Sequence, residues 1–409
     1  MDVCGRVGHP LCEMKKFGPF LDFGLAATTP YPLDIKVESA DGVWLQCDGG
    51  RKLFDAISGV GVSNFGHGND AISKALHAQI DLNLHTMVYG EFIHESTLKA
   101  GKLLTSFLPR SLDTVYFVNS GAEAVEGALK LSKRVTGRSK MIGCKGGYHG
   151  NTHGALSVSS NAERKAPFSP LLPEISFIEF NCQESLKLID SSVACVIIET
   201  VQGDAGVVIP KQQWMTALRE KCTSTGTLLI LDEIQCGMGR CGAPFTFTEY
   251  NITPDILCVG KALGGGMPIG AFVSSRKNMS LLSHSPALGH VTTFGGHPVA
   301  TAGSGAALTI LKEIDWIAIE RRGKDWEARL KAHPLVKNVR RKGYFFAVEM
   351  ESEELATKAI LNGLEVGILL FWFLSVPNAF RLQPHLTMTD EEVEVGINMI
   401  LAALELIDT

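Results

Sequence analysis

The sequence has no apolar run long enough to cross a bilayer. Its N-terminus also has no positively charged stretch followed by an apolar segment, so neither a membrane protein nor a secretory precursor is expected. The formal net charge is −5, which gives no electrostatic reason to expect nucleic acid or an anionic membrane as partner. We therefore expect a cytoplasmic protein.

The ten cysteines form no CxxC pair. Several lie inside apolar segments, among them Cys195 and Cys258, where a thiol behaves as a small hydrophobic group. This usage is typical of a reducing compartment rather than of a disulfide framework. Internal repeats and low-complexity segments are also absent. The densest basic run, residues 337–342, predicts a solvated turn rather than a binding patch.

The chain of 409 residues is long enough for a large core and two domains. Between residues 114 and 272, short apolar segments alternate with amphipathic ones, which predicts an α/β fold with a mostly parallel sheet flanked by helices. Strands are expected at 115–118, 141–142, 195–198, 228–231, 256–259 and 271–273, and helices at 123–134 and 211–224.

The rest of the chain differs in pattern. Long helices are expected at 299–314, 316–332 and 391–406, with strands at 344–350 and 379–382. We predict three parts: an irregular N-terminal arm that also joins the small domain (1–45), a large domain (46–297) and a smaller α+β domain (298–409).

Polar residues stand where the predicted strands end. Asp232 follows one apolar strand, Glu199 a second and Lys261 a third. A fourth strand ends at residues 119–121, which open directly into a helix. Because ligands bind at the carboxyl ends of parallel strands, these groups are expected to share one site.

The set offers an amine, a carboxylate and a helix N-terminus suited to a phosphate, which together meet the needs of pyridoxal 5′-phosphate. The amine can form a Schiff base, and the carboxylate can keep the pyridine nitrogen protonated. Tyr148 in "GGYHGNTHG" suits a ring stacked on the cofactor. Singly, Ser120 and Glu123 could be a simple capping box, and Lys261 could be a surface lysine.

Several stretches, in order and spacing, resemble the class III pyridoxal-phosphate aminotransferases, the family of the ornithine, acetylornithine, 4-aminobutyrate and diaminopelargonate transaminases. They are "NSGAEAVEGALKLS", "GGYHGNTHGALS", "IIETVQGDAGVVIP", "LLILDEIQCGMGR", "CVGKALGGGMPIGA" and "TTFGGHPVA". The resemblance covers most of the chain. It implies a fold-type-I homodimer with shared active sites, whose large domain binds the cofactor.

The resemblance also implies roles for individual residues. Lys261 would be the Schiff-base lysine, and Asp232 the partner of the pyridine nitrogen. The cofactor-binding set would be Ser120, Gly121, Ala122, Tyr148, Glu199, Asp232, Gln235, Lys261 and, from the neighbouring subunit, Thr293. Arg381 falls where the family binds a substrate carboxylate, which a guanidinium can hold through two hydrogen bonds. The implied reaction is ping-pong transamination with 2-oxoglutarate or pyruvate as acceptor.

Two candidate substrate-binding positions depart from the commoner family pattern. Asn151 stands where many members have an arginine, and an amide can hydrogen-bond a carboxylate without neutralising it. This weakens the case for ornithine or acetylornithine as donor, and "YHGNT" is nearer to diaminopelargonate-type members. Asp204 replaces the glutamate that gates Arg381, and its shorter side chain predicts a looser or water-mediated contact.

Other readings of the sequence remain. Residues 237–242 fit the dinucleotide motif G-x-G-x-x-G, but no helix is expected to open there. His149 and His153 have the spacing of helical metal ligands, yet glycines around them favour a loop, and no metal site is expected. An aminomutase or racemase would use the same cofactor. A non-catalytic binding protein would have no need of the buried amine of Lys261.

Overall fold

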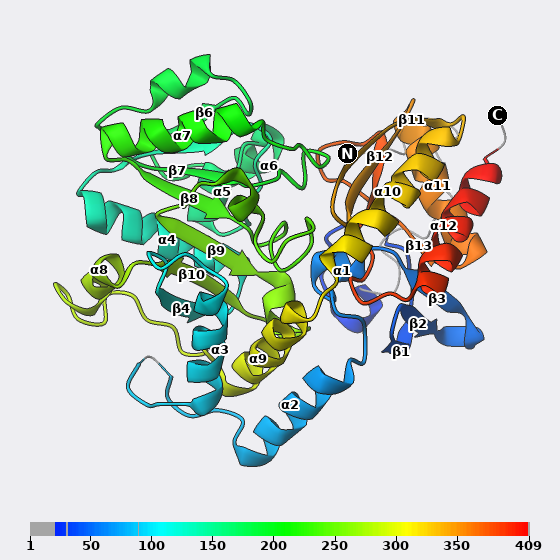
Figure 1. The fold of residues 1–409 in the computed structure, drawn as a ribbon, viewed down its shortest axis with the longest axis horizontal. Coiled ribbons are helices and arrows are strands. Elements are labelled where there is room, and N and C mark those ends of the chain that lie inside the picture. Colours follow the sequence, from blue (N-terminus) through cyan, green and yellow to red (C-terminus); the bar gives the residue numbers. More distant parts are fainter. Residues whose placement is uncertain (1–20, 30–31, 89, 408–409) are drawn as a thin grey trace.

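The computed structural model describes residues 21–29, 32–88 and 90–407. A seven-stranded sheet in the order β4-β10-β9-β8-β7-β5-β6 forms the centre of the larger part of the molecule (Figure 1). Its strands are β4 (Thr114–Val118), β5 (Lys140–Cys144), β6 (Ile175–Ile178), β7 (Val193–Glu199), β8 (Leu228–Asp232), β9 (Ile256–Gly260) and β10 (Gly270–Ser274).

The middle of this sheet is parallel, as the sequence predicted. Strands β6, β5, β7, β8 and β9 run in the same direction, whereas β10 is antiparallel to both β9 and β4. All residues of β7 are buried. Val196 and Ile198 pack in one hydrophobic core, and Cys195 and Ile197 pack in another. The continuous apolar run therefore reflects a strand covered on both faces.

Helices lie on both sides of the sheet. They are α2 (Asp70–Leu82), α3 (Glu95–Ser106), α4 (Gly121–Thr136), α5 (His153–Val158), α6 (Ala162–Lys165), α7 (Gln212–Thr225), α8 (Arg276–Met279) and α9 (Pro298–Lys312). Helix α4 packs close to β10, since a Cβ at Gly127 would lie 2.3 Å from the ring of Phe272. Among the described residues, none of the helices combines the length and apolarity needed to span a bilayer.

The smaller part of the molecule, on the right in Figure 1, contains two further sheets. One has the order β1-β2-β3-β13 and the other the order β11-β12-β15-β14. Their strands are β1 (Val37–Asp41), β2 (Trp44–Cys47), β3 (Lys52–Asp55), β11 (Val336–Lys342), β12 (Phe345–Met350), β13 (Ile368–Leu369), β14 (Phe371–Trp372) and β15 (Ala379–Leu382). The short α1 (Ser58–Gly61) follows β3, and the long helices here are α10 (Trp316–Ala332), α11 (Glu353–Val366) and α12 (Asp390–Glu405).

Two sequence predictions fail in this region. The N-terminal arm (1–45), expected to be irregular and to join the small domain, lies partly outside the described residues, but from Val37 it forms β1 and leads into β2, and β3 pairs in parallel with β13 from far along the chain. The basic run at 337–342, expected to be a turn, lies in β11. Val336 and Val339 are the buried residues of this strand, and Arg341 forms ion pairs with Glu320 and Glu327 of α10. Charged side chains are well suited to an edge strand.

Candidate active site

The carboxyl ends of β7, β8 and β9 bring the predicted charged residues to one edge of the central sheet. Glu199 and Asp232 are direct register partners on neighbouring strands, and Lys261 follows β9. A cavity of about 490 Å³ opens at this edge. Eight of the predicted site residues line it: Gly121, Ala122, Tyr148, Asn151, Glu199, Asp232, Gln235 and Lys261.

Lys261 begins a short 3-10 turn, Lys261–Gly264, and has a left-handed backbone with φ of 47°. Such a conformation is costly for a residue with a side chain and is usually kept where function requires it. Burial lowers the pKa of the Lys261 amine below its ordinary value, and the carboxylates of Asp232 and Glu199 partly oppose this effect. The amine is therefore closer to its nucleophilic neutral form than a surface lysine would be.

Asp232 is buried and held by two contacts. Its Oδ1 accepts the N–H of Ile234 at 3.0 Å, and its Oδ2 lies 2.8 Å from Nδ1 of His149. The Nε2 atom of His149 is buried and has no hydrogen-bond partner among the described residues. Sequence reasoning treated His149 only as a possible metal ligand and missed this contact, because His149 precedes Asp232 by 83 positions.

Glu199 organises the loop that carries Tyr148. Its two carboxylate oxygens accept the backbone N–H of Tyr148 at 2.7 Å and of Gly203 at 2.6 Å. Burial raises the pKa of Glu199 to about 7, an effect that His149 opposes and Asp232 reinforces. Glu199 thus fixes the position of the Tyr148 backbone, and Tyr148 lines the cavity.

The N-terminus of α4 also faces the cavity, through Gly121 and Ala122. Ser120 caps the helix by accepting the N–H of Glu123 at 3.2 Å, while the Glu123 carboxylate accepts the N–H of Asn119 at 2.6 Å. In a capping box the Glu123 carboxylate would accept the backbone N–H of Ser120, but here it accepts that of Asn119. The first backbone N–H groups of a helix have no partner within it, so this end suits an anion.

Glycines let the chain segments around the cavity approach one another. Gly150 has φ of 125°, and a Cβ there would lie 2.8 Å from that of Ala122. At Gly121 an added Cβ would lie 2.8 Å from the side chain of Ile234. These positions require glycine both for space and, at Gly150, for conformation.

Arg381 and Asp204 form an ion pair outside the cavity lining. The guanidinium Nη2 lies 3.6 Å from Asp204 Oδ1, which is beyond hydrogen-bond distance and agrees with the looser contact expected for the shorter acid. Asp204 instead accepts the N–H of Leu374 at 2.8 Å and the hydroxyl of Ser375 at 2.6 Å. Arg381 donates to the carbonyl of Trp372 at 2.9 Å.

Ser120 and Thr293 also lie outside the cavity lining. Thr293 is exposed, and its carbonyl oxygen lies 3.1 Å from Nε2 of His85.

Neither competing sequence motif adopts the helix that its proposed role requires. α5 begins at His153, so His149 and His153 do not share a helix. After the G-x-G-x-x-G stretch the chain forms a 3-10 segment, Thr246–Tyr250, instead of the required helix. The eight cysteines within the described residues are free thiols, and Cys4 and Cys12 lie outside those residues.

Comparison with known proteins finds relatives that match nearly the whole chain. A family model described as aminotransferase class III matches residues 26–404. An acetylornithine aminotransferase of Methanopyrus kandleri is 36% identical over 377 residues, which cover 91% of this chain and 95% of that protein.

Solved structures show the same fold. An ornithine aminotransferase of Toxoplasma gondii ME49 superposes with a TM-score of 0.85 at 28% identity, covering 94% of this chain and 93% of that one. An amine transaminase of an uncultivated Pseudomonas species in its PLP-bound form gives a TM-score of 0.83 at 24% identity, with 93% and 97% covered.

Proposed function

The chain belongs to the class III aminotransferases, and we propose that Lys261, Asp232 and their neighbours in the cavity perform its pyridoxal-phosphate-dependent amino transfer. The observation that carries this proposal is the convergence of an amine and a buried carboxylate in one cavity. Both are provided by the ends of neighbouring strands.

The residues present fit pyridoxal phosphate. The N-terminus of α4 at Gly121 and Ala122 would hold the phosphate, with Ser120 next to it. Tyr148 would cover one face of the ring. The buried Nε2 of Gln235 has no hydrogen-bond partner among the described residues and would donate to the phenolic oxygen. When bound, the cofactor supplies an electron sink for the amino group's carbon.

Two side chains would carry the proton chemistry. Lys261 would hold the cofactor covalently through its amine and, when that amine is free, would carry a proton to and from the carbon that bears the substrate's amino group. Asp232 would keep the pyridine nitrogen protonated. His149, through its 2.8 Å contact, would keep the Asp232 carboxylate oriented, and Glu199 would hold Tyr148 in place.

For the acceptor we propose 2-oxoglutarate or pyruvate, with its carboxylate held by Arg381. Asp204 would lie behind the guanidinium and leave it able to exchange partners, since the pair is 3.6 Å apart. Asn151 lines one side of the cavity and offers a hydrogen-bonding amide without a positive charge. We therefore propose that the end of the amino donor bound there does not require a cationic partner from the protein. The two substrates would use the site in turn, which is a ping-pong sequence.

We propose a homodimer in which Thr293 reaches the cofactor of the partner. The segments around this residue expose large apolar side chains, among them Ile93 at 82% and Phe294 at 54% exposure. Exposed apolar surface of this kind marks an interaction site. Cytoplasmic residence is proposed on the free thiols of the described residues.

The proposed division of the chain keeps a large cofactor-binding domain and a C-terminal small domain, with the boundary moved from residue 298 to the end of α9, because α9 packs on α2 and α3. The pairing of β3 with β13 supports extending the N-terminal segment of the small domain to Asp55.

The test is a panel of amino donors, including ornithine, N-acetylornithine, 4-aminobutyrate and diaminopelargonate, each with 2-oxoglutarate or pyruvate. Loss of the bound cofactor's colour on adding the donor, and its return on adding the keto acid, is the expected result. Conversion of an amino acid into an isomer without added acceptor would instead favour an aminomutase or racemase. A purified protein that stays colourless with added pyridoxal phosphate would overturn the proposal.

A further inference from the structure

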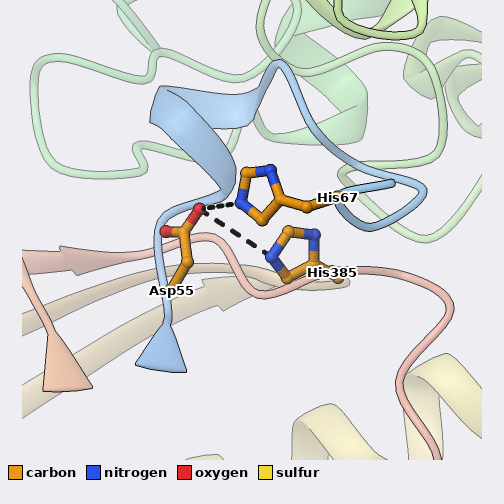
Figure 2. Close-up of side chains that lie close together, drawn as sticks. All are labelled: Asp55, His67 and His385. Carbon is orange, nitrogen blue, oxygen red and sulfur yellow. Dashed lines mark hydrogen bonds and ion pairs between the residues drawn. The ribbon is translucent and has the colours of Figure 1, made fainter. Parts of the chain in front are cut away.

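Asp55, His67 and His385 form a second cluster of reactive side chains, and none of them lines the candidate active site (Figure 2). Asp55 ends β3, His67 lies in the loop before α2, and His385 lies in the loop between β15 and α12. One carboxylate oxygen and one nitrogen of each histidine all lie within 4.8 Å of one another. The cluster therefore brings together ligand atoms from both ends of the chain.

The proton on His385 can be placed from its contacts. Its Nδ1 lies 2.6 Å from the carbonyl oxygen of Ser63, which can only accept, so Nδ1 carries the hydrogen. In this tautomer the Nε2 atom of a neutral ring has a lone pair, and it is buried without a hydrogen-bond partner among the described residues.

This lone pair points at another acceptor. His385 Nε2 lies 3.8 Å from Oδ2 of Asp55, and Figure 2 shows His67 on the same oxygen, with its Nε2 at 2.9 Å. Two acceptors that face each other inside a protein are unfavourable unless a proton or a metal cation lies between them. The Asp55 carboxylate is buried and is otherwise bound by the N–H groups of Ile57 and Gly59.

The buried guanidinium of Arg240 does not supply that cation. It hydrogen-bonds Asn64 and the carbonyls of Tyr344 and Pro384, and it makes no hydrogen bond to Asp55. Its charge acts on Asp55 and His385 only from a distance. Arg240 thus leaves the Nε2 atom of His385 without a partner.

We propose that Asp55, His67 and His385 bind one divalent transition-metal ion of the zinc type, which ties the segment after β3 to the loop after β15. Two imidazoles and a carboxylate are ligands that zinc prefers. In a tetrahedral zinc site the ligand atoms are about 3.4 Å apart, which lies between the two separations of 2.9 and 3.8 Å.

The surroundings match those of a metal-bound histidine. A ligating imidazole usually donates its second N–H to a carbonyl or carboxylate, as Nδ1 of His385 does to Ser63. On binding, the proton between His67 Nε2 and Asp55 would leave to solvent, and the metal would take its place. The His67 side chain is 17% exposed, so an ion can enter from solvent, and a water would be its fourth ligand.

The experiment uses untagged holoenzyme that is treated with a chelator, dialysed and titrated with Zn²⁺, and in parallel with Co²⁺ as a spectroscopic probe. One ion per chain is expected, with visible Co²⁺ bands of a tetrahedral nitrogen-oxygen site. The variants His67→Gln and His385→Gln should each weaken Zn²⁺ binding at least about tenfold. The matched control is His77→Gln on the exposed face of α2, which should bind as the wild type does.

Because His385 is fully buried, its variant could fail to fold, and the partly exposed His67 then decides the outcome. Retained transaminase activity and an unchanged circular dichroism spectrum will show that His67→Gln is folded. The proposal would be overturned if the wild-type protein bound less than one Zn²⁺ per chain. It would also be overturned if Zn²⁺ bound about 100-fold more weakly than it binds a competing chelating dye with about micromolar Kd. So would binding that His67→Gln leaves unchanged, since the ion would then lie elsewhere.

Discussion

His149 Nδ1 lies 2.8 Å from Asp232 Oδ2, and both side chains are buried next to the cavity that Lys261 enters. The contact joins the loop after β5 to the end of β8. It fixes the direction of the one carboxylate that the proposed mechanism needs in ionised form. In the proposed mechanism, function would therefore depend on this pair of residues, each held by a different part of the sheet.

The first prediction concerns Lys261. Lys261→Ala should abolish turnover, because no other amine lines the cavity among the described residues. The cofactor should still bind, without its covalent link, so the absorbance of the lysine-bound form should be lost. Lys145→Ala, at an exposed lysine paired with Glu179, is the control and should retain activity. A Lys261 variant that transaminates at close to the wild-type rate would contradict the assigned role.

The second prediction separates the roles of Asp232 and His149. Asp232→Ala should lose most activity and weaken cofactor binding, because the pyridine nitrogen would lose its proton. His149→Leu should reproduce part of that loss, roughly tenfold in kcat and in cofactor affinity, by removing a hydrogen bond to a charged group. His149→Asn, whose amide can replace the Nδ1 donor, should recover most of it. Equal activity of the two His149 variants would argue against a positioning role.

The third prediction tests Arg381. Arg381→Lys should raise the KM for the keto acid by roughly 10- to 100-fold, because a bidentate contact worth about 1.5–3 kcal/mol is lost. Cofactor colour should be unaffected. Arg219→Lys changes an arginine paired with Asp255 far from the cavity lining and serves as the control. An unchanged KM in the Arg381 variant would remove this residue from the substrate site.

The fourth prediction is a pH dependence of stability from Glu199, whose pKa burial raises to about 7. The unfolded chain releases this proton near pH 4.5, so the stability that the group contributes is complete below that pH. It is lost as the pH rises through 7, by up to about 3 kcal/mol, since one pKa unit corresponds to about 1.4 kcal/mol.

Glu199→Gln removes this titration. We therefore expect the difference between the Tm of the variant and the Tm of the wild type, both measured without cofactor, to increase from pH 5.5 to pH 8. The constant part of the difference reports the lost hydrogen bonds to Tyr148 and Gly203. Glu220→Gln, at an exposed helical position, should give a difference that does not depend on pH. The same flat result for Glu199→Gln would refute the prediction.

The fifth prediction concerns packing of α4 on the sheet. Gly127→Ala should destabilise the protein by about 1–3 kcal/mol, because the new Cβ would lie 2.3 Å from the buried ring of Phe272. Gly305→Ala, inside α9 with no heavy atom within 4 Å of the added Cβ, should instead stabilise by about 0.5–1 kcal/mol. Urea denaturation of both variants measures the contrast, and equal effects would contradict it.

Much of the central sheet was predictable because its strands are continuous apolar runs. Strands β7, β8 and β9 are buried on both faces, and the change to a polar residue at Glu199, Asp232 or Lys261 marks where each one ends. The helices α10 and α12 were likewise located from their periodicity, at Trp316–Ala332 and Asp390–Glu405.

Other features depend on contacts that local patterns do not encode. The charged run at 337–342 has the pattern of a polar turn. It forms a strand, in which Arg341 pairs with Glu320 and Glu327 of α10. Strand β13 has two residues and exists because β3 pairs with it. Short segments of this kind have too little apolar periodicity to be recognised alone.

The sequence by itself determined the chemistry at the strand ends, since an amine, acids and a helix N-terminus following buried strands must meet at one edge of a parallel sheet. Tertiary structure decided which residues touch. It placed His149 on Asp232, loosened Arg381 from Asp204, and brought His385 to Asp55 and His67. Such contacts join segments far apart in the chain, and their distances follow from how whole layers pack rather than from any local pattern.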